Sequence, residues 1–62
     1  MDLHVKVGDL VRKVSGNDMG KTGLLTGIIS NDCGNSFGKI LIFDGTYVVW
    51  YIPLIEVVNE SW

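Results

Sequence analysis

Cysteine and histidine are the residue types in this chain best suited to nucleophilic catalysis or metal binding, and each occurs once. A nucleophile–base pair would need the thiol of Cys33 within hydrogen-bonding reach of the imidazole of His4. Cys33 lies in a polar segment at mid-chain and His4 near the start, and nothing in the sequence brings them together. A structural zinc site normally takes four ligands of these types. We therefore expect neither a catalytic dyad nor a metal site.

Acidic residues and glycine-rich loops are the other usual carriers of chemistry, and here both have ordinary structural explanations. A carboxylate pair for acid–base catalysis would have to come from Asp9, Asp32, Asp44 or Glu56. Asp44 belongs to a predicted turn, and Asp9 opens a predicted strand. The segment 20–23, Gly-Lys-Thr-Gly, is similar to part of a phosphate-binding loop, but such a loop leads into a helix. Here strand-forming residues follow, so we predict a non-enzymatic protein without a cofactor.

The length and composition of the chain favour association with a partner. Its 62 residues allow one domain, which we place at 1–62 with a core at about 5–58 and a C-terminal tail at 59–62. A chain this short buries only about 60% of its unfolded surface, and a single cysteine excludes an internal disulfide. Hydrophobic residues make up 47% of the sequence, and the mean hydropathy is +0.31. Either part of this apolar surface faces a partner, which we expect, or it is the surface that small β-domains ordinarily show.

Charge and cysteine usage bear on partners and compartment. The formal net charge is −2, which disfavours general phosphate binding, although the basic residues lie mostly in the first half and could form a local strip. One unpaired cysteine suggests a reducing compartment, and the N-terminus has no apolar run of signal-peptide length. The longest apolar stretch, 47–55, is too short to cross a bilayer. We expect no membrane association and no secretion.

Short runs of Val, Ile, Leu, Thr and aromatic residues between glycine-rich polar segments predict β-strands. Five strands are expected, at about 9–14, 22–30, 39–43, 46–52 and 54–58. Gly23 and Gly27 indicate a bulge or bend in the second strand, and Pro53 ends the fourth because it lacks an N–H. The predicted fold is all-β, a small five-stranded antiparallel barrel whose closure would remove exposed strand edges.

The Asp44-Gly45 dipeptide predicts a hairpin with a two-residue type I′ turn. In that register Phe43 lies opposite Thr46, and Lys39 lies opposite Trp50. Alternation then gives one face without charge, which we predict to be the core: Ile40, Ile42, Tyr47, Val49 and Tyr51. The opposite face carries Lys39 and Thr46 and points outward. It exposes the candidate partner-binding residues Leu41, Phe43, Val48 and Trp50.

Three alternatives to this interpretation remain open. Loops or the C-terminal tail, for example Trp62, could cover the outward face. The aromatic residues could also simply fill a small core, or line a groove that stacks a nucleobase or a proline-rich peptide. We favour the core for Tyr47 and Tyr51 and leave Trp50 open.

Several segments together resemble SH3-like and KOW domains. The segment 7–12, Val-Gly-Asp-Leu-Val-Arg, resembles their opening strand, and 20–29 resembles the KOW pattern through Gly23, Leu25 and Ile28. Residues 40–45 with 48–50 resemble the central hairpin of such barrels, and 54–58 resembles the closing strand. The same order is similar to that of short proteins from tailed bacteriophages, notably those of marine cyanobacteria. The resemblance covers nearly the whole chain and implies an SH3-like barrel.

From these patterns we expect a small non-catalytic protein-binding module. The resemblance implies a phage accessory or virion-associated structural protein that docks on a larger viral or host protein or on itself, in the host cytoplasm or the virion. The alternative is a KOW-like module that binds RNA, the ribosome or the transcription machinery. The chain departs from that pattern because it is acidic, and the loop at 15–20 contains Asp18 and no arginine.

Overall fold

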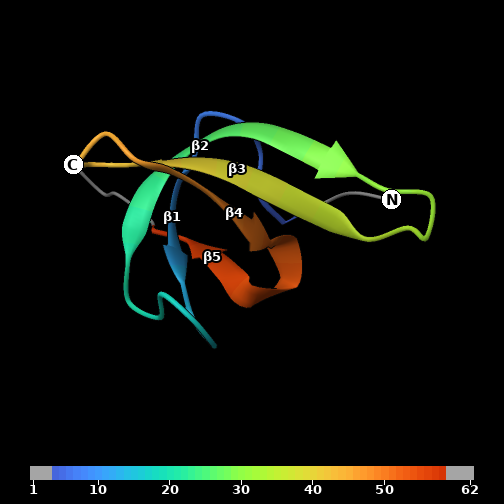
Figure 1. The fold of residues 1–62 in the computed structure, drawn as a ribbon, viewed down its shortest axis with the longest axis horizontal. Helices are drawn as coiled ribbons and strands as arrows, with labels where there is room; N and C mark the ends of the chain where they lie inside the picture. The colour runs from blue at the N-terminus through green and yellow to red at the C-terminus, as the bar shows by residue number, and fades with distance from the viewer. Residues whose placement is uncertain (1–3, 59–62) are drawn as a thin grey trace.

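The computed structural model describes residues 4–58, and these form a five-stranded antiparallel sheet (Figure 1). The strands are β1 (Leu10–Lys13), β2 (Thr22–Ser30), β3 (Ser36–Ile42), β4 (Tyr47–Tyr51) and β5 (Ile55–Val57). One 3-10 turn, Ile52–Leu54, is the sole helix in the described part of the chain and contains Pro53. The predicted all-β, five-stranded antiparallel fold is confirmed. The predicted tail at 59–62 lies outside the described residues.

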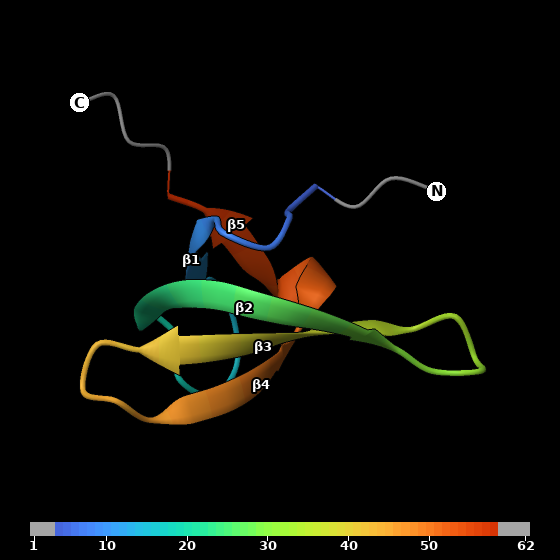
Figure 2. The same cartoon turned by 90° about the horizontal axis from the view of Figure 1, so that it is seen from above.

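The strand order is β4-β3-β2-β1-β5, and the sheet is open. Among residues 4–58 no ladder joins β4 to β5, so the expected closure into a barrel is not confirmed. The long β2 strand pairs with β1 through residues 22–24 and with β3 from Gly23 to Ser30. Figure 2 shows β2, β3 and β4 as one layer, with β1 and β5 lying to one side of it.

A bulge in β2 bends the sheet where the glycine pattern predicted one. The register shifts between Leu25 and Gly27, so that Thr26 is the extra residue opposite β3. The Thr26 hydroxyl donates a hydrogen bond to the backbone oxygen of Lys39, 3.0 Å away. The bulge therefore lets one strand belong both to the β1–β5 part of the sheet and to the β3–β4 part.

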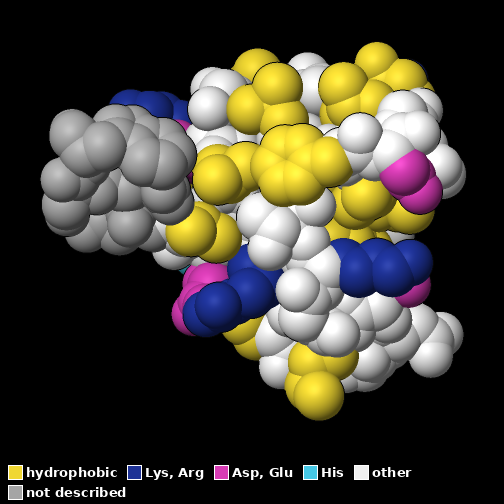
Figure 3. Space-filling view, turned by 90° about the vertical axis from the view of Figure 1, so that its left-hand side faces the viewer, with side chains coloured by type: hydrophobic (Ala, Val, Ile, Leu, Met, Phe, Trp, Pro, Cys, Tyr) yellow, Lys and Arg dark blue, Asp and Glu magenta, His cyan; other side chains and the backbone are white. Residues whose placement is uncertain are grey.

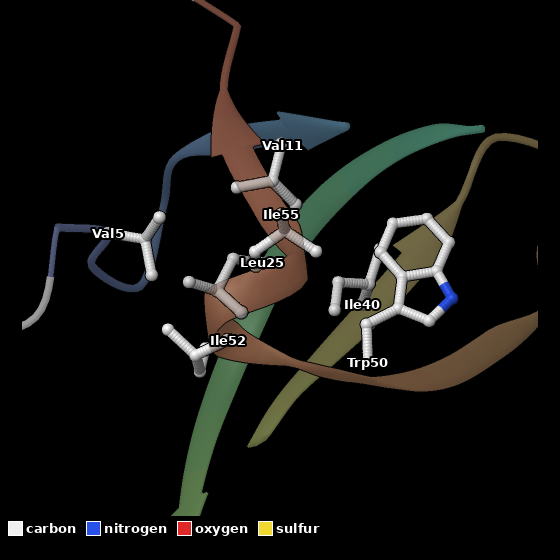
Figure 4. Close-up of a cluster of buried hydrophobic side chains, with 7 residues drawn as sticks. All are labelled: Val5, Val11, Leu25, Ile40, Trp50, Ile52 and Ile55. Carbon is white, nitrogen blue, oxygen red and sulfur yellow. The ribbon is translucent and has the colours of Figure 1, made fainter. Parts of the chain in front are cut away.

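The core lies on the concave side of this bent sheet (Figure 4). Its buried members are Val5, Val11, Leu25, Ile40, Trp50, Ile52 and Ile55. Gly38 is also buried, and a Cβ there would lie 2.7 Å from Cδ1 of Leu25 and 3.1 Å from Cδ1 of Ile52. A side chain at position 38 would therefore displace core atoms.

The β3–β4 turn has three residues, not the two predicted. The Ile42 N–H donates to the Thr46 oxygen at 2.8 Å, and the Gly45 N–H donates to the Ile42 oxygen at 2.9 Å. The loop is therefore Phe43, Asp44 and Gly45. Gly45 has φ 92°, a left-handed conformation that the predicted type I′ turn would also require at this residue. Such three-residue loops combine a type I turn with a bulge at a left-handed glycine.

The longer turn makes the predicted register wrong by one residue. Leu41 pairs with Tyr47, Ile40 with Val48 and Gly38 with Trp50. Because side chains alternate along a strand, a slip of one residue exchanges the two faces of β4 relative to β3. The predicted core residues Ile40 and Ile42 do point inward. On β4, however, Val48 and Trp50 point inward, while Tyr47, Val49 and Tyr51 point outward.

Candidate protein-binding face

The convex side of β2, β3 and β4 carries rows of apolar side chains that point away from the core. One row runs across the paired residues Leu24, Leu41 and Tyr47, and another across Ile29, Phe37 and Tyr51. Between them lies a row made by Gly27, Lys39 and Val49. We call this surface, together with Phe43 in the adjoining turn, the outer face.

Most of the exposed bulky apolar residues in the described chain belong to the outer face. Ten large hydrophobic residues among 4–58 are exposed, and six of these lie on it. They are Leu24, Ile29, Phe43, Tyr47, Val49 and Tyr51. Phe43 is 75% exposed and Val49 58%. Figure 3 looks onto the end of the molecule that holds the β3–β4 turn, where hydrophobic side chains gather and charged side chains border them.

Side-chain contacts order the outer face before any partner binds. The rings of Phe37 and Tyr51 pack with their centroids 5.3 Å apart and their planes tilted by 43°. The ammonium of Lys39 lies 5.0 Å from the centroid of the Tyr47 ring, a cation–π contact. The Tyr51 hydroxyl donates to Oδ1 of Asn35 at 3.3 Å. Pre-ordered aromatic side chains lose less conformational entropy on binding, which favours association.

Trp50 was a candidate contact residue, and the structure assigns it to the core instead. Its side chain is 3% exposed, and its indole Nε1–H donates to Oδ2 of Asp18 at 3.2 Å. The Lys13 ammonium lies 5.6 Å from the centroid of the indole ring and donates to the Asn17 oxygen at 2.8 Å. Trp50 therefore anchors the loop between β1 and β2 and presents no stacking surface to a nucleobase.

Asp18 is the partner of that indole and has an unusual backbone. Its φ of 67° makes it the one non-glycine residue with positive φ in the described part of the chain. The hydrogen bond from Trp50 lowers the pKa of the Asp18 carboxyl, and the ammonium groups of Lys21 and Lys13 lower it further. Nζ of Lys21 lies 3.4 Å from Oδ1 of Asp18. The ionised form of Asp18 is thus the form that holds the loop.

The basic side chains do not form a free strip. Arg12 pairs with Glu56 across the β1–β5 ladder, and Lys21 pairs with Asp18. Lys13 is buried against Trp50, and Lys39 lies over Tyr47. Four of the five Lys and Arg residues are therefore engaged with acidic or aromatic side chains.

The residues considered for chemistry have separate structural surroundings. Nε2 of His4 lies 2.8 Å from the backbone oxygen of Ile55 and holds the N-terminal segment against β5. Cys33 is an exposed free thiol in the β2–β3 loop. Within residues 4–58, no group of three or more His, Cys, Asp or Glu side chains is arranged to hold a metal ion. In the same range, no helix is long and apolar enough to span a bilayer.

No protein-family model and no curated protein matches this chain.

Sequence reasoning found part of the outer face. Leu41 and Phe43 lie on it as predicted, with Leu41 half-buried and Phe43 strongly exposed. Val48 and Trp50 were assigned to it and belong to the core. Sequence reasoning placed Tyr47, Val49 and Tyr51 in the core, and it assigned no role to Leu24, Ile29 or Phe37. The signal that could have corrected β4 is the Asp-Gly turn itself, because a glycine can also close a three-residue loop.

Proposed function

We propose that this protein is a non-catalytic protein-binding module that docks on a larger protein through its outer face. One observation carries the proposal. Six of the ten exposed large hydrophobic residues among 4–58 lie on or beside one face of three neighbouring strands. Contiguous apolar patches of this kind mark interaction sites on small soluble domains.

The chemistry of the outer face suits a protein partner. Tyrosine and phenylalanine are enriched at the centres of protein interfaces, and charged residues are depleted there. The outer rows contain two tyrosines and a phenylalanine, and their single charged residue, Lys39, is in contact with Tyr47. Burying apolar area contributes about 25 cal/mol per Å². Each aromatic ring can therefore supply a useful fraction of the affinity.

The proposed biological setting rests on the sequence resemblance. An SH3-like barrel, the fold that the resemblance implies, would agree with the strand order β4-β3-β2-β1-β5 and with the 3-10 turn before β5. The resemblance to short proteins of tailed bacteriophages supports a phage accessory or virion-associated structural role, in the host cytoplasm or the virion. The KOW-like alternative, binding to RNA or to the ribosome, has less support because most basic side chains are already paired.

The test compares two exposed apolar residues, one on the outer face and one away from it. Phe43 is 75% exposed beside the face, and Met19 is 68% exposed in the β1–β2 loop. We expect Phe43→Ser to reduce capture of a defined set of proteins from source-cell extract, measured by quantitative mass spectrometry, and Met19→Ser to leave it intact. Equal capture by all three proteins contradicts the proposal. A salt-sensitive shift of RNA in a gel, with no protein captured, would support the KOW-like alternative.

A further inference from the structure

The free edge of β4 has backbone hydrogen-bonding groups that neither the described sheet nor the outer face uses. β4 is the last strand of the sheet, and no other described strand pairs with its far side. The hydrogen bond from Ile42 N–H to the Thr46 oxygen fixes which pairs of the hairpin are bonded. Bonded pairs alternate in an antiparallel ladder, so Ile40–Val48 and Gly38–Trp50 are the next ones. The N–H and C=O groups of Tyr47, Val49 and Tyr51 therefore point to the free edge.

This edge lacks the features that normally block edge pairing. Natural edge strands are protected by charged residues, proline, bulges or very short length. β4 is Tyr-Val-Val-Trp-Tyr, five residues with high strand propensity and no charge. The opposite edge of the sheet is protected in these ways. β5 has only three residues, and it carries Glu56, which pairs with Arg12. It also begins directly after the 3-10 turn that contains Pro53. The β5 edge is therefore protected against pairing with another strand, and the β4 edge is not.

The β4 edge is complementary to itself about Val49. In an antiparallel pair of two β4 strands centred on Val49, each Val49 faces the other Val49, and Tyr47 faces Tyr51 of the second copy. All these residues direct their backbone groups to the free edge, so every such pair can exchange both hydrogen bonds. A register shifted by one residue would set these groups against residues whose N–H and C=O already bond to β3. The centred register is therefore chemically favoured.

The same register also matches the outer faces of the two copies. The row ending in Tyr47 would continue into the row that begins with Tyr51 of the second copy and packs against its Phe37. The middle row would join Val49 to Val49, which brings no charges together at the seam. Aromatic pairs directly opposite each other stabilise antiparallel strands.

We propose that two copies of this chain pair edge to edge through β4, with Val49 on the two-fold axis, to form one continuous sheet. The inference rests on the proposed function and extends it by a second interface. Pairing through β4 would join the outer faces of two copies into one surface of twice the area, and this surface would stay accessible to the larger partner. It concerns the backbone edge, whereas docking of the larger partner concerns exposed side chains.

The first experiment measures the mass of the protein in solution by size-exclusion chromatography with light scattering. We expect the wild type to elute as two chains and Val49→Pro as one folded chain. Proline removes the edge N–H without removing a bond to β3, and edge strands tolerate it. Val49→Thr keeps the N–H and should remain a dimer. A wild type that stays monomeric at millimolar concentration, or a Val49→Pro variant that still dimerises, overturns the proposal.

The second experiment reads the register and does not depend on how Val49→Pro folds. In a Cys33→Ser background, Val49→Cys places two thiols opposite each other at the axis, within the Cα separation that a disulfide accepts. Tyr47→Cys places its two thiols four residues apart along the strand, about 13 Å at the usual rise. We expect mild oxidation to cross-link the first variant and not the second. Equal cross-linking of both overturns the proposed register.

The two proposals fail in different ways. If Val49→Pro is monomeric and still captures the proteins that Phe43→Ser loses, the edge and the face act independently, and both proposals stand. If the wild type dimerises but Phe43→Ser loses nothing, the dimer stands and the docking of a larger partner falls.

Discussion

The indole N–H of Trp50 and the carboxylate of Asp18 form a hydrogen bond of 3.2 Å that joins β4 to the loop between β1 and β2. The two residues are 32 positions apart in the chain. Asp18 holds a left-handed backbone conformation, which costs a non-glycine residue about 1–2 kcal/mol. The left-handed conformation brings the Asp18 carboxylate to the one polar atom of the buried indole ring, and the resulting hydrogen bond offsets its cost.

The first prediction concerns the pKa of Asp18. Trp50→Phe keeps an aromatic ring in the core and removes the indole donor. Since that donor is the largest cause of the lowered pKa, we expect the Asp18 pKa to move up toward its ordinary value. Carboxyl chemical shifts followed by NMR against pH measure it directly. Tyr51→Phe, which removes a hydroxyl on the outer face, is the control, and an unchanged Asp18 pKa in Trp50→Phe contradicts the assignment.

The second prediction concerns stability in acid. Asp18 and Asp44 both have a folded pKa below 3.8, Asp18 through Trp50 and Asp44 through the Thr46 backbone N–H. A carboxylate with a depressed folded pKa stabilises the fold fully above its unfolded pKa, and this contribution is lost as pH falls through the folded pKa. We expect wild-type stability to fall below pH 3.8. Below that pH, the free energy of unfolding of Asp18→Asn, measured by urea titration, should fall less steeply with pH than that of the wild type. An identical pH dependence in the two proteins would contradict this linkage.

The third prediction separates core from surface on the β3–β4 hairpin. Trp50 is 3% exposed, and Phe43 is 75% exposed. Removing a buried Trp costs about 3–5 kcal/mol, which can equal the stability of so small a domain. We expect Trp50→Ala to unfold the protein. Phe43→Ala should stay within about 0.5 kcal/mol of the wild type. Circular dichroism with thermal melts distinguishes them, and a folded Trp50→Ala would contradict the observed register.

The fourth prediction tests the close packing at Gly38. A Cβ at position 38 would lie 2.7 Å from Leu25 and 3.1 Å from Ile52. We expect Gly38→Ala to cost about 1–3 kcal/mol through overpacking. Gly27→Ala is the matched control, because its nearest side-chain neighbour would be 4.0 Å away. Chemical denaturation compares the two variants, and equal losses of stability would contradict crowding at position 38 as the cause.

The fifth prediction concerns the loop that carries Cys33. Oδ1 of Asn31 accepts hydrogen bonds from the backbone N–H groups of Cys33 at 3.0 Å and Asn35 at 3.1 Å. The Cys33 side chain itself is exposed. We expect Cys33→Ser to change stability by less than about 0.5 kcal/mol. Asn31→Ala should cost about 1 kcal/mol through its lost hydrogen bonds. A large loss in Cys33→Ser would show that the thiol is engaged.

The sequence predicted the strands better than it predicted the faces. The bounds of β2 match the prediction, and the bulge lies between Leu25 and Gly27, as the glycines indicated. β3 begins at Ser36, earlier than predicted, because Phe37 and Gly38 continue the ladder opposite Tyr51 and Trp50. Local patterns determine where strands form, so these features could be predicted from sequence.

The face of β4 could not be predicted in the same way. Both sides of Tyr47–Tyr51 are apolar, so alternation between polar and apolar residues could not indicate which side is buried. The decision depends on a turn of three residues and on an indole that reaches Asp18 in another loop. The contact between Trp50 and Asp18 joins residues far apart in the sequence, so no local sequence pattern predicts it.

The length of the β3–β4 turn has a consequence for sequence change in this protein. Loss of one residue from Phe43-Asp44-Gly45 would leave a two-residue turn. The register of β4 against β3 would then shift by one residue, and the inward and outward sides of β4 would be exchanged. Because neither face carries a charge, hydrophobicity would resist such slippage only weakly. Insertions and deletions at this turn would therefore change which aromatic residues reach solvent, while most substitutions there would not. The turn should vary in residue type far more readily than in length.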